Sequence, residues 1–99
     1  MQNRVYIRAS QAQHTPAGKF LGDVYYRTRF LENTLQYDEH SGYPHNGGEH
    51  SLSLSLTPSD LSAFLTLVEE TFPNHPGAAP FVASVRERFA ERYPAMQLM

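Results

Sequence analysis

The chain has 99 residues, no cysteine, 40% hydrophobic and 18% charged residues, and a formal net charge of −2. This length suits one domain, the composition is too apolar for a disordered chain, and no apolar run approaches the roughly 20 residues of a membrane span. The lack of cysteine excludes disulfides, thiolate metal sites and cysteine redox chemistry. We therefore expect a cytoplasmic domain without a signal peptide or a membrane segment.

The charges are unevenly distributed along the chain. Residues 1–37 hold five basic and two acidic side chains, whereas residues 38–75 hold six acidic side chains and no Lys or Arg. Such an asymmetry bears on partners and not on the fold. Residues 1–37 are therefore net basic and residues 38–75 net acidic, although the net charge of the chain is small.

The first predicted strand lies at the N-terminus. Val5, Ile7 and Ala9 alternate with polar or amphipathic residues, which is the period of two of a half-buried strand. Residues 10–19 collect Ser, Pro and Gly without periodicity and predict a loop.

Residues 20–37 fit two structures. One face of a helix would carry Leu21, Val24, Tyr25, Thr28, Leu31 and Leu35. The aromatic and β-branched content and Gly22 favour instead a hairpin with a two-residue turn at Glu32-Asn33. Its strands would match apolar with apolar and charged with polar or oppositely charged residues: Phe30 with Leu35, Thr28 with Tyr37, Arg29 with Gln36 and Arg27 with Asp38. We expect the hairpin, with the helix as the alternative.

The clearest strand covers residues 50–57, where leucines at 52, 54 and 56 alternate with serines at 51, 53 and 55. The leucine face should be buried and the serine face exposed to solvent. A helix follows, because Thr57 can cap it, Pro58 suits its first turn and Asp60 adds an acidic group there. This helix ends at Pro73, and a second one is predicted from about residue 79 to residue 93, before Pro94.

These elements predict the α+β class: a small antiparallel sheet of three to four strands, mostly in the N-terminal half, with two C-terminal helices packed on one face. We expect residues 1–99 to form a single domain, with a sheet-forming half (1–57), a helical half (58–94) and a tail (95–99). The predicted shared core contains Leu52, Leu54, Leu56, Phe64, Leu65, Val68, Val85 and Phe89.

A histidine-rich segment joins the predicted strands that end at His40 and begin at His50. A zinc ion would need three or four converging nitrogen and oxygen ligands, and the candidates are His40, His45, Glu49 and His50. The register of the leucines puts His50 on the core side of the sheet and His40 on the outer side, unless a bulge reverses the parity. A metal-binding loop therefore competes with a solvated polar loop and with a recognition loop.

Catalytic motifs are lacking in the sequence. There is no Gly-x-Ser-x-Gly elbow and no phosphate-binding loop. Asp38 and Glu39 are adjacent on a predicted strand, so they point to opposite faces and cannot easily share a proton. We expect a protein that is not an enzyme and has no cofactor.

The outer face of the predicted sheet is the main candidate site. It should display side chains that are rich in Tyr and Arg, next to the acidic start of the histidine loop; the predicted partner-binding residues are Tyr6, Arg8, Tyr25, Arg27, Arg29, Asp38 and Glu39. Tyr and Arg are enriched among interface hot spots because they combine contact area with hydrogen-bonding ends. An ordinary solvated face is the alternative.

The sequence thus predicts a protein-binding module, such as a small inhibitor or regulator that occludes a partner's surface. Immunity proteins and phage-encoded inhibitors of host defence act in this way, an analogy of class that rests on no shared residues. A single-stranded nucleic-acid binder is the first alternative, since bases stack on tyrosines and phosphates meet arginines, although net acidity and the single lysine, Lys19, weaken it. The histidine-loop metal protein is the second, and a homodimer is compatible with any of these functions.

Overall fold

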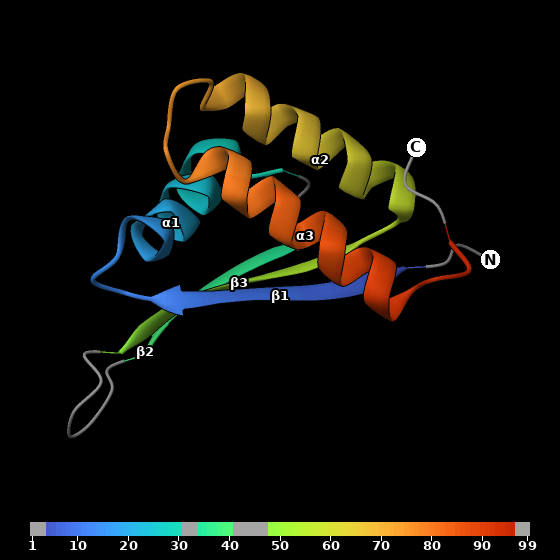
Figure 1. Ribbon diagram of the computed structural model, residues 1–99, viewed down its shortest axis with the longest axis horizontal. Helices are drawn as coiled ribbons and strands as arrows, with labels where there is room; N and C mark the ends of the chain where they lie inside the picture. The colour runs from blue at the N-terminus through green and yellow to red at the C-terminus, as the bar shows by residue number, and fades with distance from the viewer. Residues whose placement is uncertain (1–3, 31–33, 41–47, 97–99) are drawn as a thin grey trace.

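The computed structural model describes residues 4–30, 34–40 and 48–96, and it describes His40 by its backbone alone. Within these residues the chain forms three strands and three helices (Figure 1). In chain order they are β1 (Val5–Ala12), α1 (Pro16–Thr28), β2 (Leu35–His40), β3 (Glu49–Leu56), α2 (Pro58–Thr71) and α3 (Ala78–Arg92). The predicted α+β class with a three-stranded antiparallel sheet is confirmed.

The sheet has the order β1-β3-β2, and β3 runs antiparallel to both neighbours. β1 and β2 are therefore parallel to each other, and α1 connects them across β3. Leu54 occupies the middle of the register, opposite Ile7 on one side and Leu35 on the other. The predicted strand at residues 50–57 is thus the central strand of the sheet.

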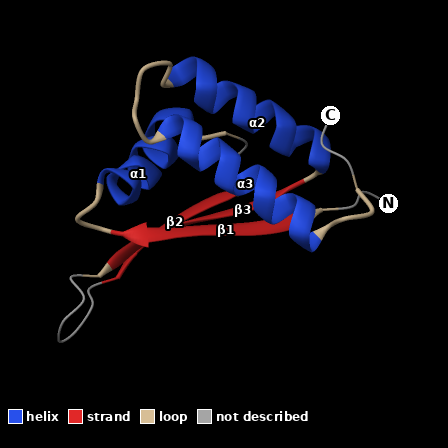
Figure 2. Cartoon of the chain, in the orientation of Figure 1, coloured by secondary structure: helices blue, strands red, loops and turns tan. Residues whose placement is uncertain are grey.

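All three helices lie on the same face of the sheet (Figure 2). The opposite face, here called the outer face, carries no helix in either view (Figures 1 and 2). The two predicted C-terminal helices therefore pack where the sequence indicated, with α1 as a third helix beside them. None of the helices in the described parts of the chain combines the length and apolar character that a membrane span requires.

The helix α1 corrects the hairpin predicted for residues 20–37 and the second half of the loop predicted for residues 10–19. The hydroxyl of Thr15 accepts a hydrogen bond from the Gly18 N–H at 3.0 Å, which caps the helix, and Pro16 occupies its first turn. Phe20, Leu21 and Val24 are buried along one side of it, at the spacing of a helical apolar face. The helix that was the alternative to the hairpin is correct for residues 20–28, whereas residues 35–37 belong to β2.

With α1 in place, the predicted pairing of Phe30, Thr28, Arg29 and Arg27 with β2 does not form. β2 pairs with β3 instead, so that Leu35 faces Leu54 and Tyr37 faces Leu52. The predicted turn at 32–33 lies outside the described residues. The loop prediction for residues 10–19 was wrong at both ends, because β1 extends to Ala12 and α1 begins at Pro16.

The two C-terminal helices follow their sequence signals. The Asp60 N–H donates to the hydroxyl of Thr57 at 3.2 Å, and Pro58 begins α2. α3 begins at Ala78 and ends at Arg92, within one residue of the predicted bounds. Both helix predictions are confirmed.

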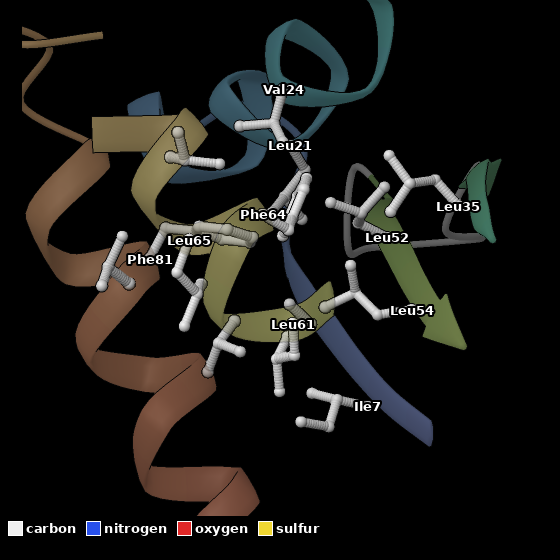
Figure 3. Packing of buried hydrophobic residues seen from close by; sticks show 14 of the residues in the cluster. Ile7, Leu21, Val24, Leu35, Leu52, Leu54, Leu61, Phe64, Leu65 and Phe81 are labelled. Carbon is white, nitrogen blue, oxygen red and sulfur yellow. The ribbon is translucent and has the colours of Figure 1, made fainter. Parts of the chain in front are cut away.

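The core lies between the inner face of the sheet and the helices (Figure 3). All eight residues predicted to share it are buried: Leu52, Leu54, Leu56, Phe64, Leu65, Val68, Val85 and Phe89. Phe20 joins them from α1, where its ring lies 5.1 Å from that of Phe72 and 5.6 Å from that of Phe81. These ring contacts hold the first half of α1 against the end of α2 and the start of α3.

Candidate functional site

The outer face of the sheet is polar and held by hydrogen bonds between neighbouring strands. Arg8 in β1 donates to the hydroxyl of Ser51 in β3 at 3.1 Å. The hydroxyl oxygen of Ser10 is hydrogen-bonded to the same Ser51 hydroxyl at 2.9 Å. These contacts explain why Ser51 is only 1% exposed although no helix covers it. At the other end of β3, Arg4 donates to the hydroxyl and the carbonyl of Ser55.

A large open groove of about 1160 Å³ lies at one end of the molecule. It gathers the start of β1, the end of α1, the start of β2, the end of β3 and the end of α3. We call it the Tyr/Arg groove, and its described lining residues are Tyr6, Ile7, Arg8, Tyr25, Tyr26, Arg29, Phe30, Thr34, Leu35, Gln36, Ser53, Leu54, Ser55 and Arg92.

The lining of the Tyr/Arg groove has one sign of charge. It includes three arginines and three tyrosines, and none of its described residues is Asp or Glu. Within the described part of the chain, the two close contacts between basic and acidic side chains both involve histidine, so Arg8, Arg29 and Arg92 have no carboxylate partner there. Because nothing described neutralises these guanidinium groups, the groove is suited to an anionic partner.

Arg29 lines the groove in a strained backbone conformation. It is the C-cap of α1, with a φ of 43° and a ψ of 44°, and its N–H donates to the Tyr25 carbonyl at 3.2 Å. Glycine is the usual residue at this left-handed position, because a Cβ atom there costs about 1 kcal/mol. Strain of this kind is often found where a side chain has a function.

Replacing Arg29 with glycine should therefore stabilise the protein by about 0.5–1 kcal/mol, since it relieves the left-handed strain. Urea unfolding would measure the change. Arg29→Ala is the matched control, because it removes the same guanidinium but keeps the Cβ atom and should bring no such gain. If Arg29→Gly were less stable than Arg29→Ala, the cap would not be strained.

A second cluster lies beside the groove, at the free edge of β2. The rings of Tyr25, Tyr26 and Tyr37 lie 5.1 to 5.9 Å apart, and we call them the tyrosine cluster. Tyr26 is 60% exposed, so the cluster presents an aromatic surface to solvent.

The hydroxyl of Tyr37 is tied to a carboxylate. It donates to Glu39 Oε1 at 3.2 Å. Burial, followed by the hydrogen bond and charge of Glu39, raises the pKa of Tyr37 to about 12. Glu39 Oε1 also lies 3.6 Å from His50 Nε2, and His50 Nδ1 lies 3.0 Å from the Gly18 carbonyl oxygen. His50 thus links the start of α1 to β2.

Five of the predicted partner-binding residues lie on the outer face or line the groove. Tyr6 and Arg8 lie on the outer face and line the groove, and Asp38 lies on the outer face of β2, opposite Ser51. Tyr25 and Arg29 also line the groove, but they reach it from α1 and not from a strand.

Arg27 was misplaced by the predicted hairpin, and Glu39 points away from the outer face, as its alternation with Asp38 requires. Arg27 lies on α1 with its guanidinium carbon 5.6 Å from the centre of the Phe72 ring, so the predicted pair with Asp38 does not form. Glu39 lies on the helix side of the sheet, where its carboxylate contacts Tyr37 of β2 and His50 of β3. Neither residue is among those that line the groove.

Within the described part of the chain, the proposed metal ligands do not converge on one point. His45 lies outside them, as does the side chain of His40, while Glu49 and His50 are neighbours on β3 and point to opposite faces. No group of three or more His, Asp or Glu residues within the described ranges is arranged to hold a metal ion. The predicted core-side position of His50 agrees with its contact with Gly18.

Several groove residues, among them Tyr26, Gln36 and Arg92, were not predicted from the sequence. Tyr26 alternates with Tyr25, so the predicted hairpin turned it away from the outer face. The proximity of Arg92 to β1 depends on the packing of α3. The hydroxyl of Tyr93, the next residue, accepts a hydrogen bond from the Tyr6 N–H at 2.9 Å and so places this end of α3 beside β1.

No family model, no curated protein and no solved structure matches the chain.

Proposed function

We propose that the protein is a non-enzymatic binding module whose Tyr/Arg groove receives an acidic surface of another protein. The observation that carries this proposal is the one-signed lining of the groove, with three arginines, three tyrosines and no described carboxylate. Arginine and tyrosine supply most of the energy in many protein interfaces. A module of this kind would act by covering the surface that it binds.

The outer face beyond the groove favours a protein over a nucleic acid as the partner. Asp38 and Glu49 lie on that face, toward the opposite end of the sheet from Arg4 and Tyr6. A phosphate backbone that followed the strands would be repelled by these carboxylates, whereas a protein surface can carry both signs of charge. The small number of basic residues, 8 against 10 acidic ones in the whole chain, also limits a phosphate footprint.

The test compares a double variant, Arg8→Ala with Arg92→Ala, to the parent. The tagged proteins are used to capture partners from nuclease-treated extracts of the cells that make the protein, and the captured protein is then purified for calorimetric titration. We expect the double variant to bind this partner more weakly by about 1–3 kcal/mol, because two guanidinium groups of the groove are lost. Its melting temperature should change only slightly, since exposed charges contribute little to folding.

Arg86→Ala is the matched control, because Arg86 is exposed on α3 and is not among the groove residues. It removes one guanidinium charge outside the groove and should leave binding unchanged. Equal binding by the double variant and the parent would exclude the groove as the site.

Titration of a labelled single-stranded oligonucleotide of mixed sequence tests the competing function. Tight binding that falls steeply as salt rises, and that the double variant loses, would identify a nucleic-acid module instead. A protein interface should respond to salt more gently.

A further inference from the structure

The two edges of the sheet are protected differently. Backbone hydrogen bonds in an antiparallel pair alternate, so every second residue of an edge strand points its N–H and C=O away from the sheet. The Gln13 N–H donates to the Gly48 carbonyl at 3.2 Å, which fixes this alternation for β1 and turns the backbone of Tyr6 outward. The hydroxyl of Tyr93 binds that outward N–H, so the end of α3 caps the β1 edge at this point.

Within the described residues, no such cap is found on the β2 edge. The Ser55 N–H donates to the Thr34 carbonyl at 2.9 Å, so Gln36 and Asp38 exchange backbone hydrogen bonds with β3. The same alternation leaves the backbone groups of Leu35, Tyr37 and Glu39 pointing outward. No described residue hydrogen-bonds to these groups. An uncapped edge of this kind can accept another strand.

We propose that two copies of the chain associate through their β2 edges, antiparallel and around a two-fold axis at Tyr37, so that two three-stranded sheets become one. In this register Leu35 of one copy faces Glu39 of the other, and Tyr37 faces Tyr37. All three outward-pointing residues of each strand then pair with outward-pointing residues of its neighbour, and each pair exchanges backbone hydrogen bonds in both directions. The two-fold keeps both layers of helices on the same side of the joined sheet.

The charges at the two ends of the β2 edge complement each other under this symmetry. Arg29, the C-cap of α1, and Leu35, the first residue of β2, both line the Tyr/Arg groove, whereas Glu39, with a side chain 66% exposed, lies near the end of β2. Antiparallel pairing brings Arg29 of each copy next to Glu39 of the other, on the helix side of the sheet. Asp38 faces Gln36 of the second copy and not another carboxylate, so like charges are not directly opposed.

The tyrosine cluster supplies the apolar centre of the same interface. Tyr37 lies at the two-fold axis, and the exposed ring of Tyr26 lies 5.9 Å from it. Pairing would therefore bring two exposed aromatic surfaces together at the axis. The second copy would cover the β2 side of the Tyr/Arg groove and leave Tyr6, Arg8 and Arg92 open, so the inference goes beyond the proposed function and is tested without any partner.

The measurement is sedimentation velocity of the purified chain from about 1 to 200 μM, the range in which a small interface of this kind should associate. We expect the mass to rise from 11.2 kDa toward twice that value with concentration. Glu39→Pro removes an outward N–H that β3 does not use, and it should weaken association at least about tenfold more than Glu39→Ala, which keeps the N–H. The circular dichroism and melting temperature of both variants establish that they fold.

A charge exchange tests the register. Arg29→Glu should weaken the dimer, and combining it with Glu39→Arg should restore most of the loss, because each copy then presents the opposite pair of charges. A parent that stays monomeric at about 200 μM, or a dimer that folded Glu39→Pro leaves unchanged, would overturn the proposal. Failure of the Arg8 and Arg92 variants to lose partner binding would bear on the groove alone.

Discussion

Replacing Leu54 with alanine should lower the free energy of unfolding by about 2–5 kcal/mol. Leu54 is 2% exposed on the central strand, between Ile7 and Leu35 of the two neighbouring strands, and its side chain points into the core beneath the helices (Figure 3). The substitution removes buried methyl and methylene groups and leaves a cavity that rigid neighbours cannot fill. Because small domains are stable by only about 5–15 kcal/mol, this is a large share of the total.

Urea unfolding followed by circular dichroism would measure this loss. Ser53→Ala is the matched control on the adjacent residue of the same strand, where the side chain lies on the outer face. It should change stability by less than about 0.5 kcal/mol. A loss of similar size for Leu54→Ala would mean that the inner face of β3 does not form the core.

Alternation and capping signals predicted the parts of the fold whose local pattern agrees with their packing. The leucines and serines of β3 fall on opposite faces as their period of two requires, and Thr57 caps α2 through the Asp60 N–H. In these segments the residue that the local structure prefers is also the residue that the core or the solvent requires. Where local preference and tertiary packing agree in this way, the structure can be predicted from the sequence.

For residues 20–37 a helix was only the alternative to the hairpin, although α1 begins with the same signal as α2. Thr15-Pro16 matches Thr57-Pro58, and both threonine hydroxyls accept an N–H from the residue three positions on. Gly18 and Gly22 lower the intrinsic helix propensity of this segment; Gly18 contributed to the predicted loop and Gly22 to the predicted strand. Tertiary contacts explain why glycine occupies these two positions. A Cβ at Gly18 would meet the Ala12 carbonyl oxygen, and one at Gly22 would meet the Tyr37 hydroxyl.

The groove could be predicted only in part, for a related reason. Tyr6 and Arg8 follow from the alternation of β1, but Tyr26, Arg29 and Arg92 reach the groove from the ends of two helices. No spacing along the chain indicates that these helix ends meet the same end of the sheet. The sequence did predict a surface rich in Tyr and Arg, and three residues of each type line the groove.

Gly18→Ala should destabilise the protein by about 3 kcal/mol or more, even though alanine is the better helix former. The new Cβ would lie 2.2 Å from the Ala12 carbonyl oxygen and 2.9 Å from its carbonyl carbon. Both atoms belong to the backbone at the end of β1, and that oxygen also accepts the Thr15 N–H at 3.1 Å. The clash can therefore be relieved only by moving the start of α1 away from the sheet, which disturbs the packing of Phe20 and the contact of His50 with the Gly18 carbonyl.

Gly22→Ala is the matched control one turn further along the same helix. Its Cβ would lie 3.0 Å from the Tyr37 hydroxyl oxygen and 3.1 Å from the ring carbon that bears it, atoms at the far end of a side chain that can shift. A gain in helix propensity of about 1 kcal/mol opposes this small rearrangement, so the variant should stay within about 1 kcal/mol of the parent. If urea unfolding gave equal losses for the two glycines, the close approach of α1 to the end of β1 would not be what requires glycine at position 18.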